Sequence, residues 1–291
     1  MARARGAIDG DGVDAVVRRV AAAPKYRAIH PDTVRSIVTG EAAGGGRAAD
    51  VERRARLRLH KAAALYLATA SAAELLARLR AEADAPGFDL RAWCRAAMAR
   101  HVSTAERRDD LDDLYPTILG LLPGAPAALA DVACAYNVLA LPWLRDATSD
   151  HSQARRSAPA AYVGYDFNAD VVALGREVLA RTGGPGALVH ADVVVTPGVV
   201  TEEVALLLKT YHCLEARAAG SGLALVEDLR APTVVVSLPT RGGGGRAYGF
   251  GGGHGARIEA RAAERGWSIT TARLDSEEIW AIAKDGGGTD G

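Results

Sequence analysis

LADVACAYN, at Leu129–Asn137, is a short apolar run that passes into small and polar residues. It opens a part of the chain in which apolar runs of strand length alternate with helical segments. This alternation predicts a parallel sheet covered by helices on both faces, which is an α/β fold. The predicted strands are Leu129–Ala133, Ala161–Tyr165, Ala187–His190, Val204–Leu208 and Thr233–Leu238, with Ser268–Leu274 and Ile279–Ala283 as a closing hairpin.

The segments between and before these strands are predicted to be helical. Asn137–Leu144, Asp170–Arg181 and Tyr211–Ala219 lie between strands, whereas Gly242–Gly255 is nearly all glycine and is predicted to be a loop. Asp32 is expected to cap one helix. Ser103 and Glu106 are expected to form a capping box at the start of another. The helices predicted before the sheet are Val13–Ala23, one from about Thr33, Ala48–Ala70, Ser71–Ala83, Phe88–His101 and one from Ser103.

Charge divides the chain into two parts, although the formal net charge is zero. Residues 1–110 carry 20 Lys and Arg against 14 Asp and Glu, and residues 111–291 carry 15 against 21. We therefore expect a helical domain over 1–110 and an α/β domain over 111–291. A basic first half favours an anionic partner, although a solvated helical surface explains the same charge equally well.

Several classes of protein are not supported by the sequence. No apolar run is long enough for a transmembrane helix, and no apolar core follows the charged start, so a cytoplasmic protein is expected. No GxGxxG follows the first predicted strand, and neither GxxxxGK[ST] nor GxSxG occurs. The three cysteines and the histidines have no metal-ligand spacing, so we expect buried thiols and no metal site.

Two aspartates follow neighbouring predicted strands, at the edge where a parallel sheet binds its ligand. Asp166 follows the second strand, where a carboxylate can accept both hydroxyls of a ribose. Asp192 follows the third strand and is placed to bond an adenine amino group. Either one alone is a weak signal, and Asp166 can also cap the helix that follows. Together they indicate a site for a nucleoside cofactor.

Five ordered motifs make the chain resemble the 16S rRNA (guanine-1405-N7) methyltransferases, which confer aminoglycoside resistance. The resemblance covers nearly the whole chain and implies a Rossmann-like S-adenosylmethionine-dependent methyltransferase domain with a helical N-terminal domain. The motifs are Lys25-Tyr26-Arg27 with Thr33-Val34-Arg35, His101–Arg107, Asp131–Asn137 with Pro142-Trp143, Leu206–Thr210 with Cys213-Leu214-Glu215, and Pro239-Thr240-Arg241 with Arg246 and Gly249.

The resemblance implies S-adenosylmethionine as the cofactor. Asp166 is then expected at the ribose, Asp192 and Val193 at the adenine, and Ala133 near the methionine part. Arg107 is expected to pair with the cofactor carboxylate, which suits its planar fork of donors. The remaining residues implied to line the pocket are Tyr66, His101, Val102, Ser103, Leu208 and Arg217.

The resemblance also implies that the partner is 16S rRNA in the small (30S) ribosomal subunit, bound by a monomer. Lys209 and Glu215 are expected at the target base as catalytic residues, although a structural ion pair between them is nearly as good an explanation. The Gly242–Gly255 loop is expected to close over the base, unless it is an inert linker. The residues expected to contact RNA are Arg53, Arg54, Arg56, Arg58, Arg241 and Arg246.

The sequence departs from the family pattern at three places. Ala135 stands where the family has glycine, Val138 stands where it has proline, and Tyr211-His212 replaces Leu-Pro. Glycine lets a backbone approach a ligand closely, so Ala135 is expected to narrow the cofactor pocket. Two alternatives therefore stay open: a methyltransferase for a small metabolite, and a ribosome-binding homologue that has lost catalysis.

Overall fold

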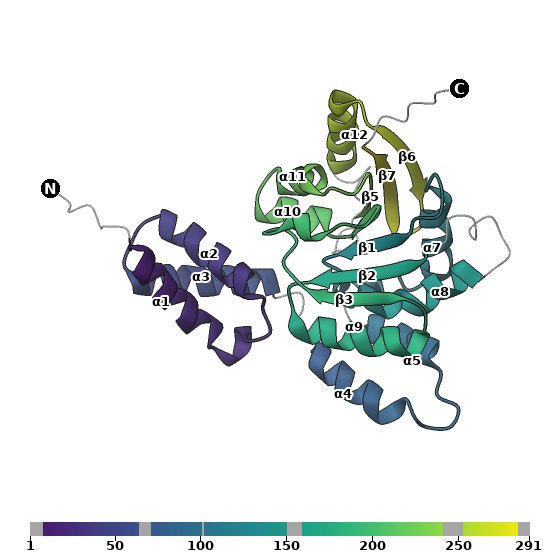
Figure 1. Cartoon of the computed structure of the whole chain (residues 1–291), viewed down its shortest axis with the longest axis horizontal. Helices are drawn as coiled ribbons and strands as arrows, with labels where there is room; N and C mark the ends of the chain where they lie inside the picture. The colour runs from purple at the N-terminus through teal and green to yellow at the C-terminus, as the bar shows by residue number, and fades with distance from the viewer. Residues whose placement is uncertain (1–7, 64–70, 101, 150–158, 241–252, 285–291) are drawn as a thin grey trace.

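The computed structural model describes residues 8–63, 71–100, 102–149, 159–240 and 253–284 (Figure 1). Within these residues the predicted α/β fold is confirmed, and every predicted strand forms to within two residues at its ends. The strands are β1 Ala128–Val132, β2 Ala161–Asp166, β3 Gly186–His190, β4 Val204–Leu208, β5 Thr233–Pro239, β6 Ser268–Arg273 and β7 Glu277–Ala283.

The strands form one sheet in the order β3-β2-β1-β4-β5-β7-β6. The first five strands are parallel, and β7 runs antiparallel between β5 and β6. Because β1 pairs with both β2 and β4, the order of the strands reverses at β1. Ligands of open α/β sheets bind at such a switch point, beyond the carboxyl ends of the strands.

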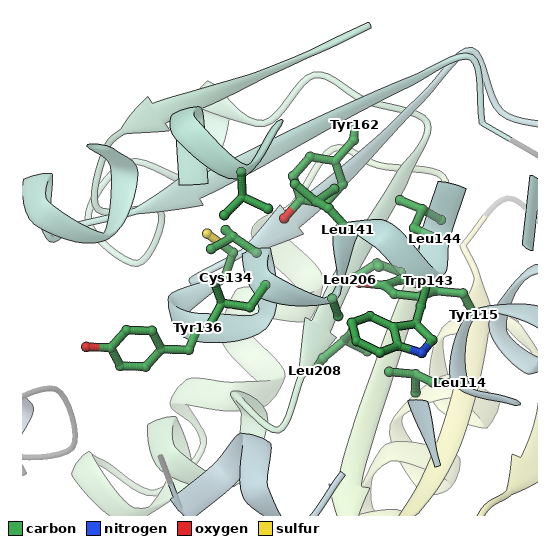
Figure 2. Packing of buried hydrophobic residues seen from close by; sticks show 14 of the residues in the cluster. Leu114, Tyr115, Cys134, Tyr136, Leu141, Trp143, Leu144, Tyr162, Leu206 and Leu208 are labelled. Atoms are coloured by element: carbon green, nitrogen blue, oxygen red, sulfur yellow. The ribbon is translucent and has the colours of Figure 1, made fainter. Parts of the chain in front are cut away.

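Helices cover both faces of the sheet, because successive strand residues point to opposite sides. In β4, Leu206 and Leu208 join one core cluster, whereas Ala205 and Leu207 join the other. Figure 2 shows part of the first cluster, with Trp143 beside the strands. The helices of the first face are α4 Ala72–Glu82, α5 Leu90–Met98, α7 Leu111–Gly120, α8 Leu141–Ser149 and α9 Ala169–Thr182, and those of the second are α10 Tyr211–Arg217, α11 Ser221–Asp228 and α12 His254–Arg265.

The first three helices form a separate bundle beside the sheet (Figure 1). They are α1 Gly10–Ala21, α2 Pro31–Ala43 and α3 Ala48–Ala63, joined in part by a 3-10 turn at Pro24–Tyr26. Their buried side chains form a core of their own, whereas α4 and α5 pack into the first core of the sheet. Helices α4 and α5, which fall within the expected 1–110 domain, therefore share the core of the sheet.

Three local details differ from the sequence-based expectations. His30, and not Asp32, caps α2: its Nδ1 accepts from the Asp32 amide, and the helix begins at Pro31. No long helix starts at Ser103, because only the short α6 Val102–Ala105 forms there before turns lead into α7. Helices α11 and α12 were not predicted, and α12 takes in His254 and Gly255 from the expected glycine loop. Short 3-10 turns lie at Ala135–Ala140 and Pro197–Val199.

Candidate active site

Asp166 closes β2 and lies at the carboxyl edge of the sheet with only 1% of its surface exposed. Its Oδ2 accepts from the Ala135 amide at 2.9 Å, and its Oδ1 accepts from the Asn168 amide at 2.8 Å. Burial raises the pKa of Asp166 to about 7, against the lowering effect of these two amides. The two bonds occupy about half of the sites at which a carboxylate can accept, so both oxygens can still receive donors from a ligand.

Near Asp166 the backbone adopts conformations that normally favour glycine. Ala133 has φ 53° and Ala135 has φ 46°, both in the left-handed region. Lys209, directly after β4, has φ 54°. These three residues follow β1 and β4, the two strands that flank the switch point. Backbone strain is therefore concentrated at the edge where open α/β sheets bind ligands, and Ala135 carries a cost that the family's glycine avoids.

Asp192 lies beyond β3 and is also buried, with 7% exposed. Its Oδ2 accepts from the Thr33 hydroxyl at 2.7 Å, and its Oδ1 accepts from the Val194 amide at 3.0 Å. Thr33 belongs to α2, so the N-terminal bundle contacts the carboxylate that was expected at the adenine. Val193, expected beside it, is buried in the second core.

Arg107 is buried with 1% exposed, and it is paired within the chain. It binds both carboxylate oxygens of Glu277, and its Nη1 donates to Asn137 Oδ1 at 2.7 Å. Burial by itself would raise the pKa of Glu277, but Arg107, with Lys209, holds that pKa below its usual value. The partner expected for Arg107 was the cofactor carboxylate, and the structure adds a protein carboxylate that the sequence analysis did not single out. The sequence feature that could have pointed to Glu277 is an acidic residue at the start of an apolar strand.

A polar network continues from Arg107 beneath the edge of the sheet. Asn137 donates from Nδ2 to Asp131 Oδ2 at 2.5 Å, and the Tyr162 hydroxyl donates to the same oxygen at 2.9 Å. Burial raises the pKa of Asp131 to about 6. The aspartate and asparagine of the LADVACAYN motif therefore brace the turn after β1 from inside the protein.

Lys209 and Glu215, expected together at the target base, lie in separate ion pairs. Lys209 Nζ is 3.0 Å from Glu106 Oε2 and 3.9 Å from Glu277 Oε1. Glu215 accepts from the Gly220 and Gly222 amides and pairs with an arginine of α12 at 3.0 Å. Lys209 thus faces the Arg107 network at the switch point, whereas Glu215 holds the connection between α10 and α11. The alternative of an ion pair between the two is wrong.

At the other departures from the family pattern, Val138 and Tyr211 are buried, and His212 is partly buried. Val138 packs in the first core, and Leu208 lies in the same core at the end of β4. Tyr211 packs in the second core, and neither its hydroxyl nor Nδ1 of His212 has a partner among the described residues. Burial, followed by the nearby charge of Lys209, lowers the pKa of His212.

The four arginines of α3 do not act as one group. Arg54 donates to Glu41 and to the backbone carbonyls of Glu41 and Gly45, which ties α3 to the end of α2. Arg58 also pairs with Glu41, and Arg56 pairs with Glu52. Arg53 is exposed, and no ion pair of the described residues engages it.

Several expected site residues lie outside the described residues, namely Tyr66, His101, Arg241, Arg246 and most of Gly242–Gly255. For Val102, Ser103 and Arg217 the backbone alone is described. In the part of the chain that the structure describes, no three His, Cys, Asp or Glu residues come together to hold a metal. No described helix is both long and apolar enough to cross a membrane. Cys94 and Cys134 are buried free thiols, as expected, and Cys213 is partly buried.

Comparison with known proteins shows the family to which the chain belongs. The family described as "Ribosomal RNA methyltransferase (FmrO)" matches residues 22–282. The chain belongs to this family. Its Rossmann-like methyltransferase fold and its dependence on S-adenosylmethionine follow from that membership and from the solved relatives.

Two curated relatives in this methyltransferase family match over most of their length. A 16S rRNA (guanine(1405)-N(7))-methyltransferase of Micromonospora echinospora is 31% identical over 94% of this chain and 97% of its own. One of Frankia casuarinae is 32% identical over 94% of each chain. Among solved structures, the 16S rRNA methylase RmtB has a TM-score of 0.71 and 26% identity, covering 94% of this chain and 98% of its own. RmtF, solved with S-adenosyl-L-homocysteine, has a TM-score of 0.69 and 25% identity, covering 95% and 99%.

Proposed function

We propose that this protein transfers the methyl group of S-adenosylmethionine to N7 of guanine 1405 in 16S rRNA of the small ribosomal subunit, and thereby confers aminoglycoside resistance. The observation that carries the proposal is the pair of buried carboxylates, Asp166 and Asp192, beyond the ends of two neighbouring strands in a chain of the ribosomal RNA methyltransferase family. Relatives at about one-third identity, over nearly the whole chain, bear that activity in their names.

The residues at this edge fit the cofactor. Both aspartates are more than nine-tenths buried and keep acceptor sites that their own chain does not use. We assign Asp166 to the ribose hydroxyls and Asp192 to the adenine amino group. We assign Arg107 to the cofactor carboxylate through those of its five N–H groups that Glu277 and Asn137 do not take.

The chemistry needs little from the protein beyond placement. The bound cofactor supplies an activated methyl group on a sulfonium. Guanine N7 carries a free lone pair at neutral pH, so no general base has to remove a proton first. The chain's task is to align N7 with the methyl group and to exclude water. A base in folded RNA must first leave its stack. Lys209, held by Glu106 at the end of β4, is the cation that we place beside that base.

The basic N-terminal half is the surface that we assign to rRNA phosphates, with exposed Arg53 as its anchor on α3. The Gly242–Gly255 loop, with Arg246, and Arg241 remain assigned to the target base. Glu215 is no longer assigned to catalysis, because its carboxylate is engaged by two amides and Arg257.

The test is methylation of purified 30S subunits with labelled S-adenosylmethionine, followed by primer extension across the decoding site. We expect one modified guanine at position 1405 and aminoglycoside resistance in a susceptible bacterium that expresses the chain. Modification of a different base, or of a small metabolite alone, would reject the proposed target. Cofactor binding in calorimetry without any methyl transfer would instead identify a homologue that has lost catalysis.

A further inference from the structure

A buried hydroxyl of the N-terminal bundle contacts the cofactor edge of the sheet. Thr33 of α2 is 2% exposed, and its Oγ1 donates to Asp192 Oδ2 at 2.7 Å. The other oxygen of Asp192 accepts from the Val194 amide at 3.0 Å. Each carboxylate oxygen is therefore held by one donor, and the orientation of the carboxylate is set jointly by two parts of the chain that are far apart in sequence.

Backbone contacts hold Thr33 in place from the preceding residues. The segment before α2 pairs with the chain that leaves β2, through an antiparallel bridge between Ile29 and Asn168. The His30 amide donates to the Phe167 carbonyl at 2.7 Å, and the Ala169 amide donates to the Ala28 carbonyl at 2.7 Å. Because these bonds lie three and five residues before Thr33, they fix its hydroxyl relative to the ends of β2 and β3.

We propose that Thr33 is a positioning residue for the adenine of the cofactor. By donating to Asp192, it keeps the carboxylate turned so that a free acceptor site faces the exocyclic amino group. This inference rests on the proposed function and on the assignment of Asp192 to adenine. It also gives the N-terminal bundle a second role, because the part of the chain assigned to rRNA then completes the cofactor site.

Adenine recognition can be tested without methyl transfer. Thr33→Val removes the hydroxyl and keeps the volume, and Thr33→Ser keeps the hydroxyl. Calorimetry would measure the Kd for S-adenosylhomocysteine and for S-inosylhomocysteine, in which oxygen replaces the adenine amino group. We expect the wild-type chain to prefer the adenosyl compound. Thr33→Val should weaken its binding by about tenfold, the size expected for a hydrogen bond to a charged group, and should leave the inosyl compound nearly unchanged.

Two controls separate positioning from folding. Thr33→Ser should restore the preference for the adenosyl compound. Thr182→Val removes a hydroxyl that bonds the Leu179 carbonyl at the end of α9, away from the site, and should keep the wild-type preference. In an Asp192→Asn background, Thr33→Val should cost much less than it does alone, because the two residues act through one interaction.

Three results would overturn the inference. One is a Thr33→Val chain that keeps the full preference for the adenosyl compound, and another is one that loses affinity for both compounds equally. The third is a wild-type chain that binds both compounds alike, because Asp192 would then not read the amino group. Methylation of 30S subunits by the wild-type chain stands apart from these outcomes, so failure of the inference is distinguishable from failure of the proposed function.

Discussion

Arg107 and Glu277, 170 residues apart in sequence, form a bidentate ion pair with both side chains almost completely buried. The pair joins the turn before α7 to the start of β7, across the carboxyl edge of the sheet. Ser237 and Lys209 also face Glu277, and Asn137 holds the other side of the Arg107 guanidinium. Glu277 thus pairs with Arg107, which we assign to the cofactor, and also lies close to Lys209, which we assign to the target base.

Glu277→Ala should destabilise the fold by about 3–5 kcal/mol, because it leaves the Arg107 charge buried without its partner. Urea denaturation followed by circular dichroism measures this change. Arg265→Ala, which removes an exposed pair with Glu227, should cost no more than about 1 kcal/mol and serves as the control. Because a matched apolar pair avoids an unpaired buried charge, Arg107→Met with Glu277→Leu should recover most of the loss. Equal effects of Glu277→Ala and Arg265→Ala would contradict this account.

Ala135→Gly should stabilise the protein. Left-handed backbone costs a residue with a side chain about 1–2 kcal/mol, and the added freedom of glycine in the unfolded chain takes back about 0.5–1 kcal/mol. We expect a net gain of up to about 1 kcal/mol in the free energy of unfolding. Ala130→Gly, inside β1, should instead destabilise, since no left-handed conformation is relieved there. If both variants lose stability alike, strain at Ala135 is not released by glycine.

Cofactor binding should depend on pH through Asp166. Burial raises its pKa to about 7, and the ribose hydroxyls need the charged carboxylate as acceptor. Affinity for S-adenosylhomocysteine should therefore fall as the pH drops below about 7, and binding near neutral pH should release protons. Calorimetry in buffers of different ionisation enthalpy measures both effects. Asp166→Asn should bind about 1.5–3 kcal/mol more weakly and lose the pH dependence, and a pH dependence that persists in this variant would assign it to another group.

The raised pKa of Asp166 also affects the stability of the fold, but in the direction opposite to its effect on cofactor binding: stability falls as the pH rises. A carboxyl group with a pKa raised from 3.8 to about 7 on folding contributes most below its unfolded pKa, and the contribution is lost as the pH rises through 7. Asp166→Asn should therefore be more stable than the wild-type chain at pH 8 without cofactor, and the advantage should shrink towards pH 4. Thermal unfolding at several pH values measures this trend. A constant difference across that range would show that the group does not titrate in it.

Two neighbouring arginines of α3 should give separable results. Arg53→Ala should weaken binding to 30S subunits and reduce its salt slope by up to about 0.9, while changing stability by no more than about 0.5 kcal/mol. Arg54→Ala should lower stability, because Arg54 ties α3 to Glu41 and Gly45. Filter binding over a range of salt concentrations and urea denaturation measure the two quantities. Loss of 30S binding by Arg54→Ala alone would reverse the assignment.

Local patterns in the sequence were enough to predict the sheet and its ligand edge. Alternating strands and helices, with Asp166 and Asp192 just beyond two apolar runs, reflect rules that act over a few residues. The predicted strands were confirmed for that reason, since burial on both faces demands continuous apolar runs. Helix starts were less certain, because several residues near each start can serve as the cap, and His30 took the place predicted for Asp32.

Tertiary structure alone decided which charged groups meet. Glu277 lies 170 residues from Arg107, and Thr33 lies 159 residues from Asp192, so no spacing rule connects either pair. The same is true of Lys209, which joined Glu106 rather than Glu215 six residues away. Hydrophobic periodicity determines which face of each element is buried, but it carries no information about which ends come together. Closing the sheet brings those ends side by side, and burial then requires each charge among them to find a partner.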